Sequence, residues 1–238
     1  MNDNMREDYE ASKSFWDTAF SMDDETKKEA ENSVDKENDW KQLASSEKLF
    51  HAVQSFGTRK RLLDYGCGEG WAAIIAAKSG CMDVTGVETA NNAVEMAKFY
   101  VNLFEVEKSV QVHHISERWI TETPAESYDG IFCSNVLDVV PEEVAEIILE
   151  NFERIAVKDA SVVIGMNYYM EPKDNDERNI TVKNGRYVYL NGVLRLVSRT
   201  DEEWTEILSR YFTVEKLEYF AWSGEETERR RLFYLKKK

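Results

Sequence analysis

The sequence predicts an α/β fold: a doubly wound, mostly parallel sheet preceded by a helical segment. Between residues 59 and 167, short apolar runs that suit strands alternate with longer stretches of helical periodicity. A glycine-rich turn joins the first of these runs to the first helical stretch. Strands that alternate with helices are linked by right-handed crossovers, and such crossovers produce a parallel sheet.

Residues 1–58 differ from the rest of the chain in composition. They hold 14 acidic and 7 basic side chains, no proline and one glycine. Apolar residues recur at helical spacing in 5–20 and in 40–56, and the polar stretch between them suits a solvated helix or a mobile loop. We therefore expect an N-terminal helical lid over residues 1–58, followed by an α/β domain over residues 59–238.

The elements of the α/β domain follow one another at short intervals. The helix expected near residue 141 opens with Pro141, at a first-turn position where the missing N–H costs nothing. Strands are expected over 61–66, 82–88, 110–115, 128–136 and 160–168, and helices over 70–80, 91–104 and 141–157.

The pattern changes after residue 167. Asn184-Gly185 and Asn191-Gly192 are hairpin-turn signals flanked by strand-forming residues, so we expect a hairpin insertion over about 178–198. A helix and two strands then complete the chain, and the simplest arrangement of the two strands is an antiparallel edge of the sheet. The helix is expected over 200–212, and the strands over 213–222 and 228–238.

Composition excludes several classes of protein. The net charge of −15 would repel a phosphate backbone, which argues against nucleic acid as a partner. The longest apolar run, 71–77, is far shorter than the ~20 residues of a membrane helix, and the acidic N-terminus does not resemble a signal peptide. Cys67, Cys81 and Cys133 have no metal-ligand spacing, so we expect no metal site and a reducing, cytoplasmic location.

The stretch 62–70, LLDYGCGEG, carries the densest chemical signal. Its glycines let the backbone turn sharply and approach a ligand, and the helix behind it leaves N–H groups free. Asp64 stands directly before the glycines, where a carboxylate would oppose a pyrophosphate, and Trp71 occupies the third-glycine position of a dinucleotide fold. These two residues argue against NAD and favour a ligand with an ammonium group or hydroxyls.

Glu88 ends the second expected strand, eighteen residues after Gly70. A carboxylate at the carboxyl end of this strand can accept hydrogen bonds from both hydroxyls of a ribose. The alternative is a solvated acid at a strand end. The glycine-rich turn upstream favours ribose binding.

The motif LLDYGCGEG, followed by VTGVE and by ESYDGIFCSNVLDVVP, resembles the class I S-adenosylmethionine-dependent methyltransferases. The resemblance covers about residues 59–167 and continues to the C-terminus in the order helix, strand, strand. It implies a seven-stranded Rossmann-like sheet with an antiparallel C-terminal strand. It also implies S-adenosylmethionine as cofactor and S-adenosylhomocysteine as product.

The resemblance implies a role for ten residues. Gly66, Gly68 and the backbone of Cys67 would pass beside the methionine part of the cofactor. Asp64 would act on its ammonium group, directly or through water, and Glu88 would hold the ribose.

The other five residues would lie at the adenine and at the sulfonium. Thr89 would line the adenine side, and Ser116 and Glu117 stand where the family often has Gly-Asp facing the adenine amino group. Ser134 and Asn135 close the fourth strand, beside the sulfonium and the incoming acceptor.

The acceptor side is less defined, and no catalytic base is identified. Trp16 follows Phe15 in an aromatic pair similar to those in relatives with a lid over the cofactor. Asp138 stands near the position of a histidine in many relatives and either faces the substrate or starts a helix. Tyr168 lies near the expected substrate mouth. Arginines of the insertion can receive a carboxylate or can simply be solvated: Arg178, Arg186, Arg195 and Arg199. Of these, Arg199 is the expected substrate contact.

The predicted function is in-line transfer of a methyl group to an O, N or C nucleophile of a small molecule. The segment 134–137 lacks the Asn/Asp-Pro-Pro-aromatic signature of nucleobase methyltransferases. Three alternatives stay open: a sensor or non-catalytic partner subunit that binds S-adenosylmethionine, a related non-methyl transfer, and a nicotinamide-dependent oxidoreductase. A monomer or homodimer is expected.

Overall fold

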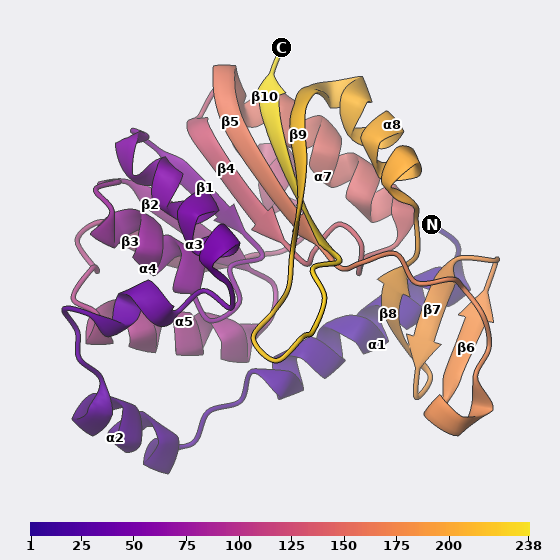
Figure 1. Cartoon of the computed structure of the whole chain (residues 1–238), viewed down its shortest axis with the longest axis horizontal. Coiled ribbons are helices and arrows are strands. Elements are labelled where there is room, and N and C mark those ends of the chain that lie inside the picture. The colour runs from indigo at the N-terminus through magenta and orange to yellow at the C-terminus, as the bar shows by residue number, and fades with distance from the viewer.

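A seven-stranded sheet forms the centre of the molecule in the computed structural model, which describes all 238 residues (Figure 1). The strand order is β3-β2-β1-β4-β5-β10-β9, and the last two strands run antiparallel to their neighbours. The predicted doubly wound sheet with an antiparallel C-terminal strand is therefore confirmed. The strands are β1 (Leu62–Tyr65), β2 (Val84–Glu88), β3 (Val110–His114), β4 (Tyr128–Ser134), β5 (Ala156–Met166), β9 (Phe212–Phe220) and β10 (Arg230–Lys237).

Helices cover both faces of this sheet, and each face has its own core. Leu62 and Leu63 are neighbours on β1 and point to opposite faces, because side chains alternate along a strand. Leu62 packs in the core with α3 and α4, whereas Leu63 packs in the core with α7 and α8. The helices of the domain are α4 (Trp71–Lys78), α5 (Asn91–Leu103), α6 (Trp119–Glu122), α7 (Glu142–Ile155) and α8 (Asp201–Tyr211).

The N-terminal segment contains three α-helices: α1 (Asp3–Ala19), α2 (Asp24–Ser33) and α3 (Glu47–Gln54). The polar stretch after residue 20 contains a helix, α2, one of the two forms considered for it. The prediction of a continuous helix over 40–56 is wrong, because a short 3-10 helix ends at Gln42 and a separate helix, α3, begins at Glu47. Ser46 makes this break, since its side chain accepts the Leu49 N–H as an N-cap.

The insertion after β5 forms a separate antiparallel sheet of β6 (Ile180–Lys183), β7 (Tyr187–Leu190) and β8 (Val193–Val197). The two expected Asn-Gly turns connect these strands. Helix α1 passes the lower end of the main sheet and packs on β8 (Figure 1). The Ser12 hydroxyl donates to the Leu194 carbonyl at 3.1 Å, and the Tyr189 hydroxyl donates to Asp8 Oδ2 at 2.6 Å.

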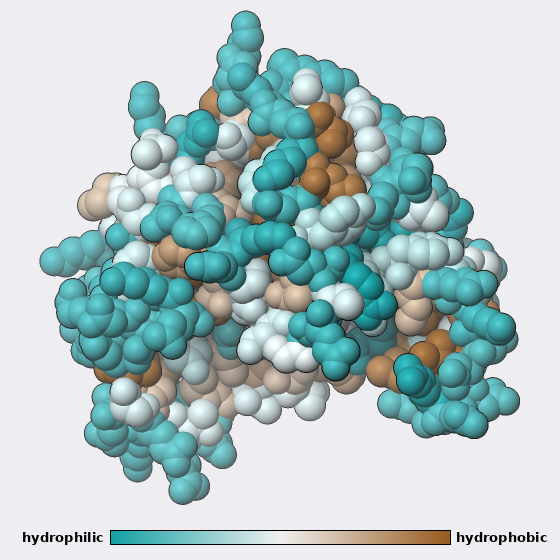
Figure 2. Space-filling model, viewed as in Figure 1, coloured by the Kyte–Doolittle hydropathy of each residue, from teal (hydrophilic) through white to brown (hydrophobic).

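The surface is polar over most of the face drawn in Figure 2, in keeping with the acidic composition. None of the helices combines the length and apolar character that crossing a bilayer requires.

Candidate cofactor and acceptor site

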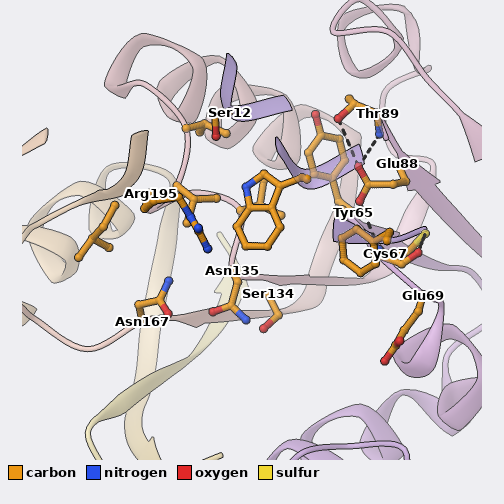
Figure 3. A pocket seen from close by; sticks show the side chains of 18 of the residues that line it. Ser12, Tyr65, Cys67, Glu69, Glu88, Thr89, Ser134, Asn135, Asn167 and Arg195 are labelled. Carbon is orange, nitrogen blue, oxygen red and sulfur yellow. Dashed lines mark hydrogen bonds between the residues drawn. The ribbon is translucent and has the colours of Figure 1, made fainter. Parts of the chain in front are cut away.

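A cavity of about 950 Å³ lies at the carboxyl ends of β1, β2, β4 and β5. Helix α1 and the insertion sheet close it on the opposite side, so its walls come from segments far apart in the sequence (Figure 3). In the order β3-β2-β1-β4-β5, the chain reverses direction across the sheet between β1 and β4. Open α/β sheets bind their ligands at this reversal point.

The glycine-rich turn between β1 and α4 forms one wall. Gly66 and Gly68 have φ angles of +71° and +52°, which residues with a side chain rarely adopt. The Gly66 and Cys67 N–H groups donate to the Val87 carbonyl at 2.9 and 3.1 Å, so β2 fixes the turn. A Cβ at Gly66 would collide with Val136, so the backbone passes where no side chain fits.

Glu88 ends β2 and lines the cavity beside this turn. Its Oε1 accepts from the backbone N–H groups of Thr89 at 2.6 Å and Ala90 at 3.1 Å, which hold the carboxylate in one orientation. Its Oε2 accepts only from the Gly68 N–H, at 3.2 Å, and keeps acceptor capacity for a ligand hydroxyl. Figure 3 shows Glu88 and Thr89 together at one end of the cavity.

Asp64 lies beneath the turn and is absent from the cavity wall. Its Oδ2 accepts the Ala73 N–H of the first turn of α4 at 3.1 Å, in a site that water does not reach. Burial raises the pKa of Asp64 to about 7, with a smaller contribution from the Glu88 charge. The structure thus gives this side chain a contact with α4 and no direct contact with a ligand in the cavity.

Ser134 and Asn135 lie at the end of β4, in the middle of the cavity (Figure 3). Asn135 has a φ of +56°, and its buried Oδ1 accepts no hydrogen bond. A buried acceptor without a partner is costly, which suits a residue that meets a ligand. Ser116 and Glu117 instead line a second, more open hollow, where the Glu117 carboxylate pairs with Lys13 at 3.2 Å.

Of the four residues expected on the acceptor side, Trp16 and Tyr168 line the cavity, whereas Asp138 and Arg199 do not. Asp138 Oδ2 accepts from the backbone N–H and the side-chain amide of Asn167, at 2.7 and 3.1 Å. It therefore joins the end of β4 to the end of β5.

Arg199 follows β8 and faces away from the cavity. Its guanidinium forms an ion pair with Glu142 and lies 5.2 Å from the centre of the Trp204 ring. These contacts attach the insertion to α7 and α8.

A family model described as "Methyltransferase domain" matches residues 40–190, which is more than half of the chain. The chain belongs to this methyltransferase family. Its cofactor is accordingly S-adenosylmethionine, and the nicotinamide alternative is set aside.

The chain is similar to curated proteins over short stretches. It is 34% identical to the ubiquinone biosynthesis O-methyltransferase of Aromatoleum aromaticum over 83 residues, which is 35% of this chain and 34% of that protein. It is 39% identical to the ribosomal protein L11 methyltransferase of Cupriavidus taiwanensis over 56 residues, 24% of this chain and 19% of that one. The chain thus spans about a third or less of the length of these relatives.

Solved structures match the chain over most of its length. An S-adenosylmethionine-dependent methyltransferase from Mesorhizobium loti aligns with a TM-score of 0.62 at 16% identity, covering 81% of this chain and 98% of that one. The 1,6-didemethyltoxoflavin-N1-methyltransferase of Burkholderia thailandensis aligns with a TM-score of 0.62 at 13% identity, covering 84% and 81%. At such identities the likeness establishes the fold alone.

The sequence did not predict several residues that line the cavity. Phe20 of the segment after α1 lies over Gly68, and Trp222 and Arg230 close the side nearest β9 and β10. Arg195 is one of four arginines in the insertion, and Arg199 is the one expected at the acceptor, yet Arg195 alone of the four lines the cavity. No sequence signal separates it from the others, since the docking of α1 on β8 decides which arginine faces inward.

Proposed function

We propose that this chain transfers the methyl group of S-adenosylmethionine to an O, N or C nucleophile of a small molecule bound in the same cavity. The observation that carries the proposal is that the cofactor region and the acceptor region belong to one continuous cavity. One cavity contains both the glycine-rich turn with Glu88 and, beyond Asn135, a chamber lined mainly by hydrophobic residues. Its volume is at the upper end of the ~300–1,000 Å³ of ligand pockets, which suits a cofactor and a small acceptor together.

The residues of the cavity fit the cofactor. The turn at Gly66 offers a backbone cradle that a Cβ would fill, and Glu88 Oε2 offers an acceptor for a ribose hydroxyl. In this assignment Thr89 lines the adenine side, and Ser134 and Asn135 lie between cofactor and acceptor. S-adenosylmethionine supplies an activated methyl group, and the chain orients the acceptor for in-line attack.

Asp64 can affect the cofactor only indirectly, by supporting the turn. Its carboxylate is held by the Ala73 N–H and lies outside the cavity wall. Ser116 and Glu117 can reach the adenine only from the neighbouring hollow. These three residues therefore have weaker support as ligand contacts than Glu88 has.

A lid role for residues 1–58 is part of this proposal. Trp16 and Phe20 line the cavity from α1 and the segment after it, and Leu43 and Leu49 line it from the region of α3. Such a cover keeps water from the reacting groups. The net charge of −15 favours a small acceptor over nucleic acid.

The names of two similar proteins support this choice of acceptor. The Burkholderia thailandensis structure holds 1,6-didemethyltoxoflavin, a small molecule, together with S-adenosylhomocysteine. The name of the Aromatoleum aromaticum relative specifies O-methyl transfer.

Calorimetric titration with S-adenosylmethionine tests the cofactor half of the proposal. We expect micromolar binding that weakens at least about tenfold in Glu88→Ala, because a hydrogen bond to a charged group contributes about 1.5–3 kcal/mol. Glu107→Ala is the matched control, since this exposed acid precedes β3 at the amino ends of the parallel strands, whereas the cavity lies at their carboxyl ends. Absence of binding to the unmodified chain would contradict the proposal.

A screen of small acceptors for formation of S-adenosylhomocysteine then tests the transfer. Product that depends on one acceptor and falls in Glu88→Ala would support catalysis. Tight cofactor binding without product from any acceptor would favour the sensor or partner-subunit alternative.

A further inference from the structure

The acceptor end of the cavity contains a cation without a counterion. Arg195, on β8, lines the cavity, and none of the carboxylates in the structure forms an ion pair with it. Three nearby arginines are neutralised: Arg186 and Arg199 pair with Glu142, and Arg230 pairs with Glu225. In a chain with 45 acidic and 30 basic residues, an unpaired arginine inside a cavity is an exception that needs a reason.

Arg195 is held in place by stacking. Its guanidinium lies 4.1 Å from the ring centre of Phe15 and 4.7 Å from that of Trp16, both on α1. Its Nε is buried and has no hydrogen-bond partner. Burial lowers the pKa of Arg195, yet the group stays charged at neutral pH, because the guanidinium of arginine is not deprotonated in proteins. The stacked guanidinium is therefore a fixed positive charge with unused N–H donors.

Two further polar atoms without partners lie in the same region. Trp16 Nε1 is a buried donor and Asn135 Oδ1 is a buried acceptor, and neither forms a hydrogen bond within the chain. Figure 3 shows the Arg195 side chain directed to the space above Asn135 and Asn167, at the far end of the cavity from Glu88. Three unsatisfied groups that border one cavity indicate a ligand with both acceptor and donor atoms.

We propose that the acceptor is a small apolar or aromatic molecule with a carboxylate that pairs with the guanidinium of Arg195. The guanidinium fork matches the geometry of a carboxylate. A single unpaired cation suits one negative charge better than the two of a phosphate. The hydrophobic lining fits the remainder of the acceptor: Val139, Val140, Met170, Leu190 and Leu196.

This inference rests on the proposed function, because it concerns the second ligand of the same cavity. A carboxylate is also present in S-adenosylmethionine itself, and this second source must be distinguished. The acceptor is favoured because Asn135 lies between Arg195 and the end of the cavity where Glu88 is found (Figure 3).

Titrations of the complex with S-adenosylhomocysteine test the inference. The probes are three acids with their matched amides: salicylate and salicylamide, anthranilate and anthranilamide, cinnamate and cinnamamide. We expect the unmodified protein to bind at least one acid about tenfold more tightly than its amide. Arg195→Met should abolish that preference, whereas Arg195→Lys, which keeps the charge but loses the fork, should retain part of it. Arg178→Met, on an exposed part of the insertion, should leave it unchanged.

S-adenosylhomocysteine binding to each variant separates the possible failures. Equal cofactor affinity in Arg195→Met and the unmodified protein, together with loss of the acid preference, supports the inference. A weaker cofactor affinity in Arg195→Met with no effect on the acids overturns it and assigns Arg195 to the cofactor carboxylate. Equal binding of acids and amides, or binding of no acid, overturns it while the proposed function stands. Failure of S-adenosylhomocysteine to bind the unmodified protein contradicts both proposals.

Discussion

Replacing Asp64 by Asn should change the way in which the stability of this protein depends on pH. The Asp64 carboxyl is fully buried beneath the glycine-rich turn, and burial raises its pKa from an ordinary 3.8 to about 7. Asn has nearly the same shape and its amide oxygen can still accept the Ala73 N–H. The substitution therefore removes the titration and keeps the hydrogen bond.

The sign of the effect follows from the raised pKa. Below pH 3.8 both the folded and the unfolded chain hold the proton, so the favourable neutral form is fully present. Between pH 3.8 and about 7 only the folded state holds the proton. The free energy of unfolding therefore falls as the pH rises, and this contribution is lost completely above about pH 7. At about 1.4 kcal/mol for each pH unit, the whole change in the free energy of unfolding is about 4 kcal/mol.

Urea denaturation followed by tryptophan fluorescence measures this free energy at pH 5.5 and at pH 8, a range that stays above the pI of about 4.8. From pH 5.5 to pH 8 the free energy of unfolding of Asp64→Asn should rise by about 2 kcal/mol relative to that of the unmodified protein. Ile131→Val, fully buried on the adjacent strand, is the control and should lower stability by about 0.5–1.5 kcal/mol equally at both pH values. If the Asp64→Asn difference is the same at both values, the reasoning is refuted.

Two other substitutions test the turn and the lid. Gly66→Ala should lower the free energy of unfolding by roughly 3 kcal/mol, because it combines an unfavourable positive φ with a collision against Val136. The added substitution Val136→Ala should recover part of this loss, and a Gly66→Ala protein as stable as the unmodified one would contradict the prediction. Asp17→Ala should lower the free energy of unfolding by about 1 kcal/mol and speed hydrogen exchange in α1, because Asp17 Oδ1 caps α5 by accepting the Asn92 N–H at 2.8 Å. Asp17→Asn should behave nearly as the unmodified chain does, and unchanged exchange in both variants would argue against the cap.

Local sequence patterns predicted the main sheet well. The strands and helices between residues 59 and 167 have strong periodicity, and the turn from β1 to α4 needs glycine for its positive φ angles. The break before α3 escaped prediction, because the apolar spacing continues across it while Ser46 caps a new helix. The four-residue helix α6 is too short to have a detectable period.

Which residues face the acceptor side of the cavity depends on contacts between distant segments, and no local sequence pattern predicts these contacts. Arg195 and Arg199 are four residues apart, yet only Arg195 faces the cavity. Arg199 stands past the end of β8 and pairs with Glu142, at the start of α7. The inward position of Arg195 depends on α1, which lies against β8 although Ser12 and Leu194 are 182 positions apart.

The sequence by itself determined the fold class, the location of the glycine-rich turn and the placement of Glu88 at a strand end. Each of these depends on spacing within a few residues, where steric limits and strand or helix periodicity act directly. Only the tertiary structure decided that Asp64 lies beneath the turn, that Asp138 joins two strand ends and that Arg195 faces the cavity. The direction of a polar side chain at a strand end depends on which distant segment packs above it, and here that segment is α1 with the insertion sheet.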